Sequence, residues 1–72
     1  MAIQEQSTKT LVDDYTNASY VYICSTYDLT ALTSEAKWTV KRITISTGLT
    51  QYADGDDLPN NIADNRASLT YV

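Results

Sequence analysis

The chain has 72 residues, of which 43% are hydrophobic, and five lysines and arginines stand against nine aspartates and glutamates for a net charge of −4. This length suits one small domain of marginal stability, and the hydrophobic content argues against intrinsic disorder. The chain has no histidine, which is the commonest general base and metal ligand in proteins. Its single cysteine excludes an internal disulfide framework, and its scattered lysines and arginines argue against nucleic-acid binding.

Residues 1–8 are polar and predict an N-terminal arm, followed by a single domain over residues 9–72. Threonine, tyrosine, valine and isoleucine are typical of strands, and no window sustains an apolar period of 3.6 residues. We therefore expect an all-β fold, a small barrel or sandwich of about five short strands.

The first two predicted strands cover residues 8–12 and 17–25, separated by a turn at Asp13 and Asp14. The second strand contains the consecutive apolar run 20–24, which places apolar side chains on both faces. Such a strand is covered on both sides in known folds. Because a chain this short has little material for two covers, we expect part of the cover to come from a second copy or from another protein.

Residues 33–36 predict one helical turn, and residues 38–46 predict the next strand. The apolar alternation of that strand changes phase, since Trp38 and Val40 share one face and Ile43 and Ile45 share the other. A β-bulge near Lys41 and Arg42 would return the two isoleucines to the core side. The expected core is then completed by residues on both strands: Trp38, Val40, Ile43, Ile45, Val21 and Ile23.

Residues 47–48 predict a turn, residues 49–53 a hairpin strand, and residues 54–61 a loop. Residues 62–66 suit one helical turn, and residues 67–72 predict a closing strand. We expect Arg66 to pair with the acidic loop at an exposed site.

No residue pattern indicates a catalytic centre. Cys24 lies in the most apolar strand, with neither a base nor an electropositive neighbour in the sequence, and we interpret it as a buried or interfacial thiol. The loop residues Asp54, Asp56 and Asp57 offer oxygen ligands at short spacing, as calcium prefers, but lack the remaining pattern of an EF-hand loop. We favour the simpler interpretation, an exposed acidic turn, and predict no metal or cofactor.

Tyrosine supplies six of the seven aromatic residues. Tyrosines are enriched at protein interfaces, but a chain without phenylalanine also uses them to build its core. Both interpretations stay open. The interface candidates are the residues around the apolar run, Tyr20, Tyr22, Cys24 and Tyr27.

Four segments together resemble a group of small virion proteins of tailed bacteriophages. They are SYVYI at 19–23, TSEAKWTVKRI at 33–43, YADG at 52–55 and NIADNRASLTY at 61–71. The resemblance covers about residues 18–72 and departs from the group at Cys24 and Leu58, where members often carry glycine and an aromatic residue. It implies a non-enzymatic, β-rich particle component present in many copies.

From these observations we expect a virion structural protein that self-associates and docks onto capsid, neck or tail subunits. It would be made in the host cytoplasm and would bind neither nucleic acid nor membrane. If the uncharged run 20–24 formed a sheet edge, it would need protection, which predicts a closed, cyclic homo-oligomer. The alternative is a small phage accessory module that binds a host protein.

Overall fold

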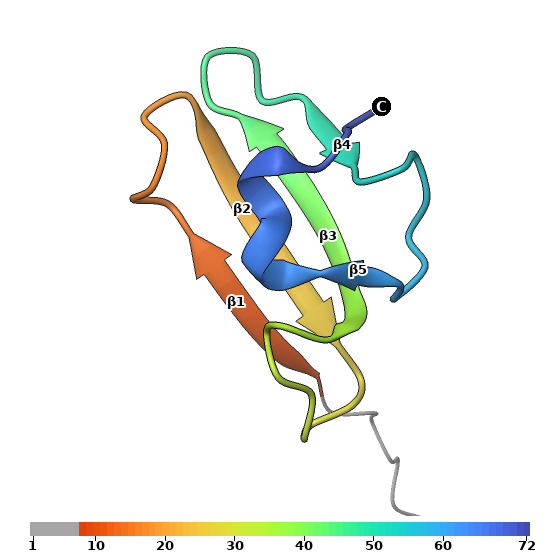
Figure 1. Ribbon diagram of the computed structural model, residues 1–72. Helices are drawn as coiled ribbons and strands as arrows, with labels where there is room; N and C mark the ends of the chain where they lie inside the picture. Colours follow the sequence, from red (N-terminus) through yellow and green to blue (C-terminus); the bar gives the residue numbers. More distant parts are fainter. Residues whose placement is uncertain (1–7) are drawn as a thin grey trace, which may run out of the picture.

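The computed structural model describes residues 8–72, which form one antiparallel sheet and a short helical turn (Figure 1). Its elements, in chain order, are β1 (Lys9–Asp13), β2 (Tyr20–Thr26), β3 (Ala36–Thr44), β4 (Thr50–Tyr52), β5 (Asn61–Ile62) and the 3₁₀ helix η1 (Ala63–Ser68). The strand order is β1-β2-β3-β4, and β5 pairs with the beginning of β3. This arrangement confirms the predicted small all-β fold, although the fifth strand lies at Asn61–Ile62, where the sequence predicted the end of a loop and a helical turn.

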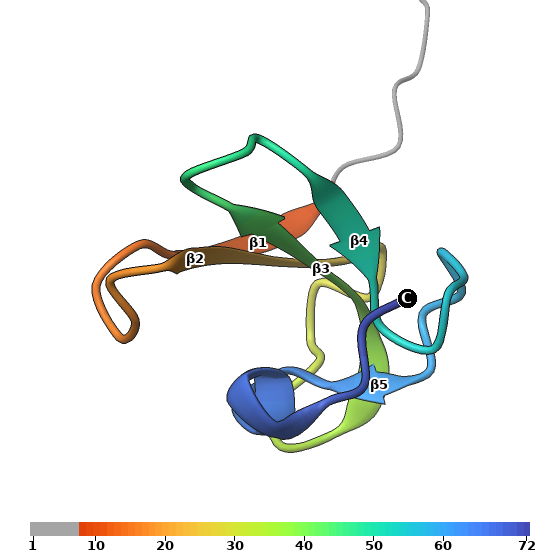
Figure 2. The ribbon, with the colours of Figure 1, turned by 90° about the horizontal axis from the view of Figure 1, so that it is seen from above.

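Strand β3 organises the sheet, because its two ends pair with different strands. Its first residues pair with β5, and its last residues pair with β4. Figure 2 shows β5 and η1 on one side of the β1-β2-β3 layer, with β4 inclined toward the other side. The sheet is thus strongly bent, but it does not close into a barrel.

The core lies between the sheet and the segment that includes β5, η1 and the residues after it. Cys24, Trp38 and Val40 point from the sheet toward this segment and are almost completely buried. They pack with residues from the surrounding loops, η1 and the C-terminal end, which are Ala31, Ala53, Ala63, Leu69 and Tyr71. The predicted core positions of Trp38 and Val40 are confirmed.

The β-bulge that we expected near Lys41 and Arg42 is absent, since β3 pairs with β2 in continuous register from Thr39 to Thr44. The irregularity lies earlier, between Ala36 and Trp38. Regular alternation therefore leaves the apolar residues after Lys41 on the face opposite Trp38. The predicted core was wrong for Ile43, Ile45, Val21 and Ile23, which lie outside the buried cluster.

Three other local predictions change for identifiable reasons. Residues 17–19 do not extend β2, because the Asn17 side chain accepts a hydrogen bond from the Ser19 amide and forms a turn. Residues 33–35 form a turn without a helix. The closing strand over 67–72 is wrong, because η1 continues through Ser68 and only Tyr71 forms an isolated bridge, to Ala53.

The predicted turn at residues 47–48 is confirmed, and Gly48 explains its position. Its φ of 72° lies in the left-handed region, where glycine has no steric penalty. Its amide donates a 2.7 Å hydrogen bond to the Thr44 carbonyl at the end of β3. The reversed chain then enters β4.

Arg66 has a different partner from the acidic loop that we expected. Its Nε donates a 2.7 Å hydrogen bond to Asp13 Oδ2, and the Asp13 side chain is fully buried. Because η1 lies over the sheet, it brings the arginine to the end of β1, far away in sequence. The pair therefore connects the two ends of the fold.

Candidate interaction surfaces

One face of the sheet is left open by the described residues, and we call it the open face. Partners in adjacent antiparallel strands share a face, and the register pairs Val12 with Ile23 and Val21 with Ile43. η1 and β5 lie on the opposite side (Figure 2). The side chain of Val12 is 53% exposed, and the other three are half-buried. The open face is thus an apolar patch across β1, β2 and β3.

This geometry explains the two-sided apolar pattern of the sequence. Tyr22 and Cys24, on one side of β2, are buried by the chain itself. Val21 and Ile23, on the other side, lack such a cover within residues 8–72. Contiguous apolar patches of this kind mark contact sites more often than scattered single residues do.

A groove with a volume of about 230 Å³ lies at one end of the open face. Its lining comes from four strands or their ends and from the loop before β5: Thr8, Ser25, Thr26, Tyr27, Thr39, Lys41, Tyr52, Asp57 and Pro59. Thr39 fixes the loop here, since its hydroxyl donates a 2.8 Å hydrogen bond to the Asp57 carbonyl. Lys41 forms no ion pair within residues 8–72. The groove is therefore lined by one basic residue, Lys41, and one acidic residue, Asp57, together with hydroxyl groups and tyrosine rings.

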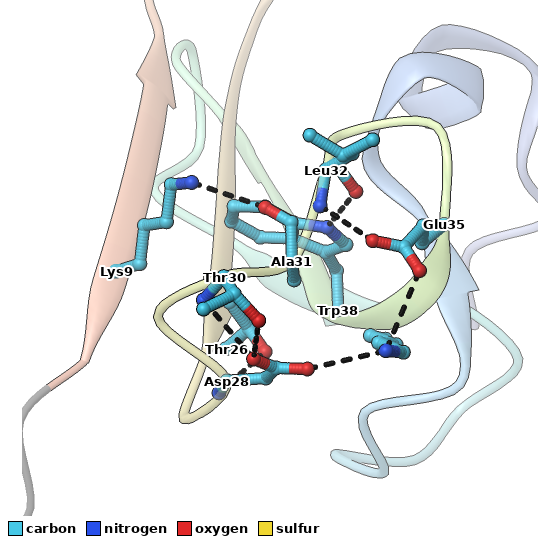
Figure 3. A network of polar contacts seen from close by, with 9 residues as sticks. Lys9, Thr26, Asp28, Thr30, Ala31, Leu32, Glu35 and Trp38 are labelled. Atoms are coloured by element: carbon cyan, nitrogen blue, oxygen red, sulfur yellow. Dashed lines mark hydrogen bonds and ion pairs between the residues drawn. The ribbon is translucent and has the colours of Figure 1, made fainter.

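The loop between β2 and β3, residues 27–35, is held by a network of polar contacts (Figure 3). The Thr26 hydroxyl accepts a hydrogen bond from the Asp28 amide, and Asp28 in turn accepts from both the amide and the hydroxyl of Thr30. Further along, Glu35 accepts from the Leu32 amide at 2.8 Å. These contacts fix both halves of the loop.

Side chains from outside the loop attach it to the rest of the fold. Lys9 Nζ donates to the Ala31 carbonyl, and Trp38 Nε1 donates to the Leu32 carbonyl, both at 3.0 Å (Figure 3). Lys37 Nζ lies 3.2 Å from Asp28 and 3.4 Å from Glu35. These contacts lower the pKa values of both carboxyl groups, through the hydrogen bonds from Thr30 to Asp28 and from Leu32 to Glu35 and then those from Lys37.

This hydrogen-bonded loop nevertheless exposes two large apolar residues, Leu29 at 55% and Leu32 at 63%. Its inward residue, Ala31, is completely buried. Fixing side chains before binding lowers the entropy cost of association. The sequence predicted only a helical turn at residues 33–36 in this segment and no contact surface around the two leucines. The available signal was a pair of leucines inside a turn-rich segment, where no strand alternation accounts for them.

No family model, curated protein or solved structure matches this chain. Its surfaces are therefore the basis for a functional proposal.

The structure divides the four predicted interface residues into two groups. Tyr22 and Cys24 are buried in the chain's own core, whereas Tyr27 is 59% exposed and Tyr20 is half-buried. The centroid of the Tyr20 ring lies 4.3 Å from the Arg42 guanidinium, which is also 4.6 Å from the centroid of the Tyr71 ring. Of the four residues, Tyr27 therefore offers the largest free surface.

The buried thiol of Cys24 lies in an environment that suppresses its reactivity. Burial raises its pKa to about 11, while Arg66 lowers it and Asp13 raises it through weaker charge effects. At neutral pH the nucleophilic thiolate is a very small fraction of such a group. Cys24 therefore packs as an apolar residue.

The predicted acidic loop lies between β4 and β5. Asp54 has a φ of 59°, and the Asp56 side chain accepts a hydrogen bond from the Leu58 amide. Within residues 8–72, no three histidine, cysteine or carboxylate groups gather closely enough to hold a metal ion. The same residues include no helix that is long and apolar enough to cross a membrane.

Proposed function

We propose that this chain is a non-enzymatic structural protein of a tailed-bacteriophage virion, which self-associates and docks onto larger capsid, neck or tail subunits. The observation that carries the docking role is the open face, where Val12, Val21, Ile23 and Ile43 form one apolar patch. The assignment to a virion rests on the sequence resemblance.

The size of the open face favours a large partner over a second copy at this site. Three strands of about five residues span an area of roughly 240 Å², from strand spacings of about 4.8 Å and 3.3 Å per residue. Two such faces would bury less than the roughly 1,200 Å² of a standard interface. A larger subunit can contact this face and its surroundings together.

Mass spectrometry of purified particles tests the virion assignment. We expect the protein to copurify with particles at a copy number comparable with that of a capsid or tail subunit. Its absence from particles, together with its presence in infected cells, would contradict the proposal and favour the accessory module that binds a host protein.

A matched pair of variants tests the docking surface. Val12→Lys places a charge on the open face, and we expect it to reduce incorporation into particles at least tenfold. Leu49→Lys is the control, because Leu49 is 54% exposed in the turn between β3 and β4. Equal incorporation of both folded variants would exclude the open face as the docking site.

A further inference from the structure

Arg42 is the centre of a polar and aromatic cluster on the side of the sheet opposite the open face. Its register partner on β2 is Tyr22, which is buried in the core. The guanidinium carbon lies 4.3 Å from the centroid of the Tyr20 ring and 4.6 Å from that of the Tyr71 ring. The guanidinium nitrogen Nη2 donates a 2.8 Å hydrogen bond to Gln51 Oε1. Residues of β2, β4 and the C-terminal segment therefore hold this cation.

The part of the chain that the structure describes gives Arg42 no negative partner. The ion pairs among residues 8–72 have Lys37 and Arg66 as their cations. Arg42 Nε is withdrawn from solvent without an acceptor, whereas Nη1, which bonds to none of these residues either, is not buried. A buried N–H group of a charged side chain is costly when it lacks an acceptor. The guanidinium is thus a held cation with unused donors, one of which solvent reaches.

The chemistry of the guanidinium indicates what can bind there. Its N–H groups lie in one plane, in an arrangement that matches the two oxygens of a carboxylate. The contacts with the two tyrosine rings and with Gln51 orient Arg42 before binding, which lowers the entropy cost of association. A bound carboxylate would supply the counter-charge that the described residues lack.

The composition of the cluster favours a protein as the source of that carboxylate. Arginine and tyrosine are among the residue types that most often carry the binding energy at protein interfaces. Tyr20, Arg42 and Tyr71 are each half-buried, so each keeps some surface for a partner. The net charge of −4 repels free anions at long range, so further contacts with the tyrosines are needed to hold an anion here.

We propose that Arg42, held by Tyr20, Tyr71 and Gln51, binds the carboxylate of an aspartate or glutamate side chain of a protein partner. The inference goes beyond the docking role of the open face, because the cluster lies on the other side of the sheet. The binding is measured on the purified chain, so it does not depend on the virion assignment.

NMR spectroscopy of the purified full-length chain tests the site, because Arg42 and Arg66 are its two arginines. Titration with glutamate capped by acetyl and methylamide groups, at constant ionic strength, should move the Nε–Hε resonance of Arg42 along a saturable curve. We expect a midpoint on the order of 10–100 mM, since one charged contact contributes little free energy. The resonance of Arg66, which already binds Asp13, should stay in place. No saturable shift at Arg42, or equal shifts of both resonances, would overturn the proposal.

Short peptides test whether the carboxylate belongs to a protein. The capped tripeptide Leu-Glu-Leu should bind at least threefold more tightly than capped glutamate, because its leucines can contact the rings of Tyr20 and Tyr71. The uncharged control Leu-Gln-Leu should leave the Arg42 resonance in place. Equal affinities of Leu-Glu-Leu and capped glutamate, or a response to Leu-Gln-Leu, would contradict the assignment.

Matched variants separate the site from the net charge of the chain, with the side-chain amide resonances of Gln51 as the readout. Arg42→Lys keeps the charge but loses the planar set of donors, and it should weaken binding of Leu-Glu-Leu at least fivefold. Lys41→Gln removes a positive charge from the opposite side of β3 and should leave the midpoint unchanged. Equal effects of the two variants would overturn the proposal, and the titration of the parent chain needs neither variant to fold.

This inference and the proposed virion role fail separately. Absence of the protein from particles would leave carboxylate binding by the purified chain intact. Absence of a shift at Arg42 would leave incorporation through the open face unaffected.

Discussion

At the scale of single residues, Asp13 and Arg66 form the most consequential polar contact. Among the ion pairs within residues 8–72, theirs is the one whose carboxylate is completely withdrawn from solvent. Burial alone would raise the pKa of Asp13, but hydrogen bonds from Thr16, Arg66 and Tyr15 outweigh it and hold this pKa well below its ordinary value. The aspartate therefore stays charged inside the fold.

We expect Arg66→Ala to lower the melting temperature by at least about 10 °C, because it leaves the buried carboxylate without its cation. An ion pair at an exposed site, as the sequence predicted, would give only a small decrease in the melting temperature. Arg66→Lys keeps the charge but loses the hydrogen bond from the guanidinium to the Ala63 carbonyl. Its melting temperature should lie between those of Arg66→Ala and the parent chain. Thermal unfolding followed by circular dichroism measures the shift, and an unchanged transition in Arg66→Ala would contradict the expectation.

The depressed pKa of Asp13 also predicts how stability changes with pH. Because the folded-state pKa lies below the ordinary value of 3.8, the unfolded chain binds this proton more readily. The stabilisation that Asp13 provides is complete at pH values above 3.8, and it is lost as the pH falls from 3.8 toward the folded-state pKa. Asp28 and Glu35, whose pKa values are also lowered, contribute in the same direction.

The Asp13→Asn variant should show a smaller decline in the free energy of unfolding between pH 6 and pH 3 than the parent chain. Urea denaturation at a series of pH values measures this decline. Asp14→Asn removes a carboxylate from the exposed neighbouring position and controls for the change in net charge. A decline as steep in Asp13→Asn as in the parent would show that Asp13 does not govern it.

At the scale of elements, β3 connects the core, the loop and the open face. Its residue Trp38 is 1% exposed, and its indole donates a hydrogen bond to the loop carbonyl of Leu32. Among the residues that follow Trp38, Val40 is buried in the core, whereas Thr39 and Lys41 on the other side of the strand line the groove. One strand therefore determines both the stability of the fold and the shape of its surface.

Trp38→Ala should cost about 3–5 kcal/mol of folding free energy through the cavity that it creates. A domain of this size has little stability beyond that amount, so we expect loss of cooperative unfolding. Trp38→Phe, which keeps an apolar ring but cannot donate to Leu32, should remain folded with reduced stability. Recovery of a cooperative transition in Trp38→Ala would show that the core does not depend on this ring.

At the scale of the whole molecule, the surface available for assembly is the open face of the sheet and not an edge formed by β2. Strand β2 lies between β1 and β3. The uncharged run 20–24 is therefore not an exposed edge, which was the condition on which the sequence predicted a cyclic oligomer. The actual edge strands are β1, with Lys9 at its beginning, and the short strands β4 and β5. Charged and short edges resist uncontrolled pairing. The predicted arm over residues 1–8 lies almost entirely outside the described residues.

The sequence by itself determined the fold class, the approximate positions of the first four strands and the burial of Trp38 and Val40. These properties follow from local alternation, turn residues and strand propensity, which act over a few neighbouring residues. The same local pattern showed that β2 has two apolar sides. It could not show which side the chain covers, because both sides alternate equally well.

Only the tertiary structure decided that β3 keeps its phase through Lys41 and Arg42, so that Ile43 joins the open face. It also brought Arg66 to Asp13, 53 residues away. The physical reason is that strand register and the path of the last residues over the sheet are set by packing of the entire chain. No local pattern of side chains records these long-range contacts.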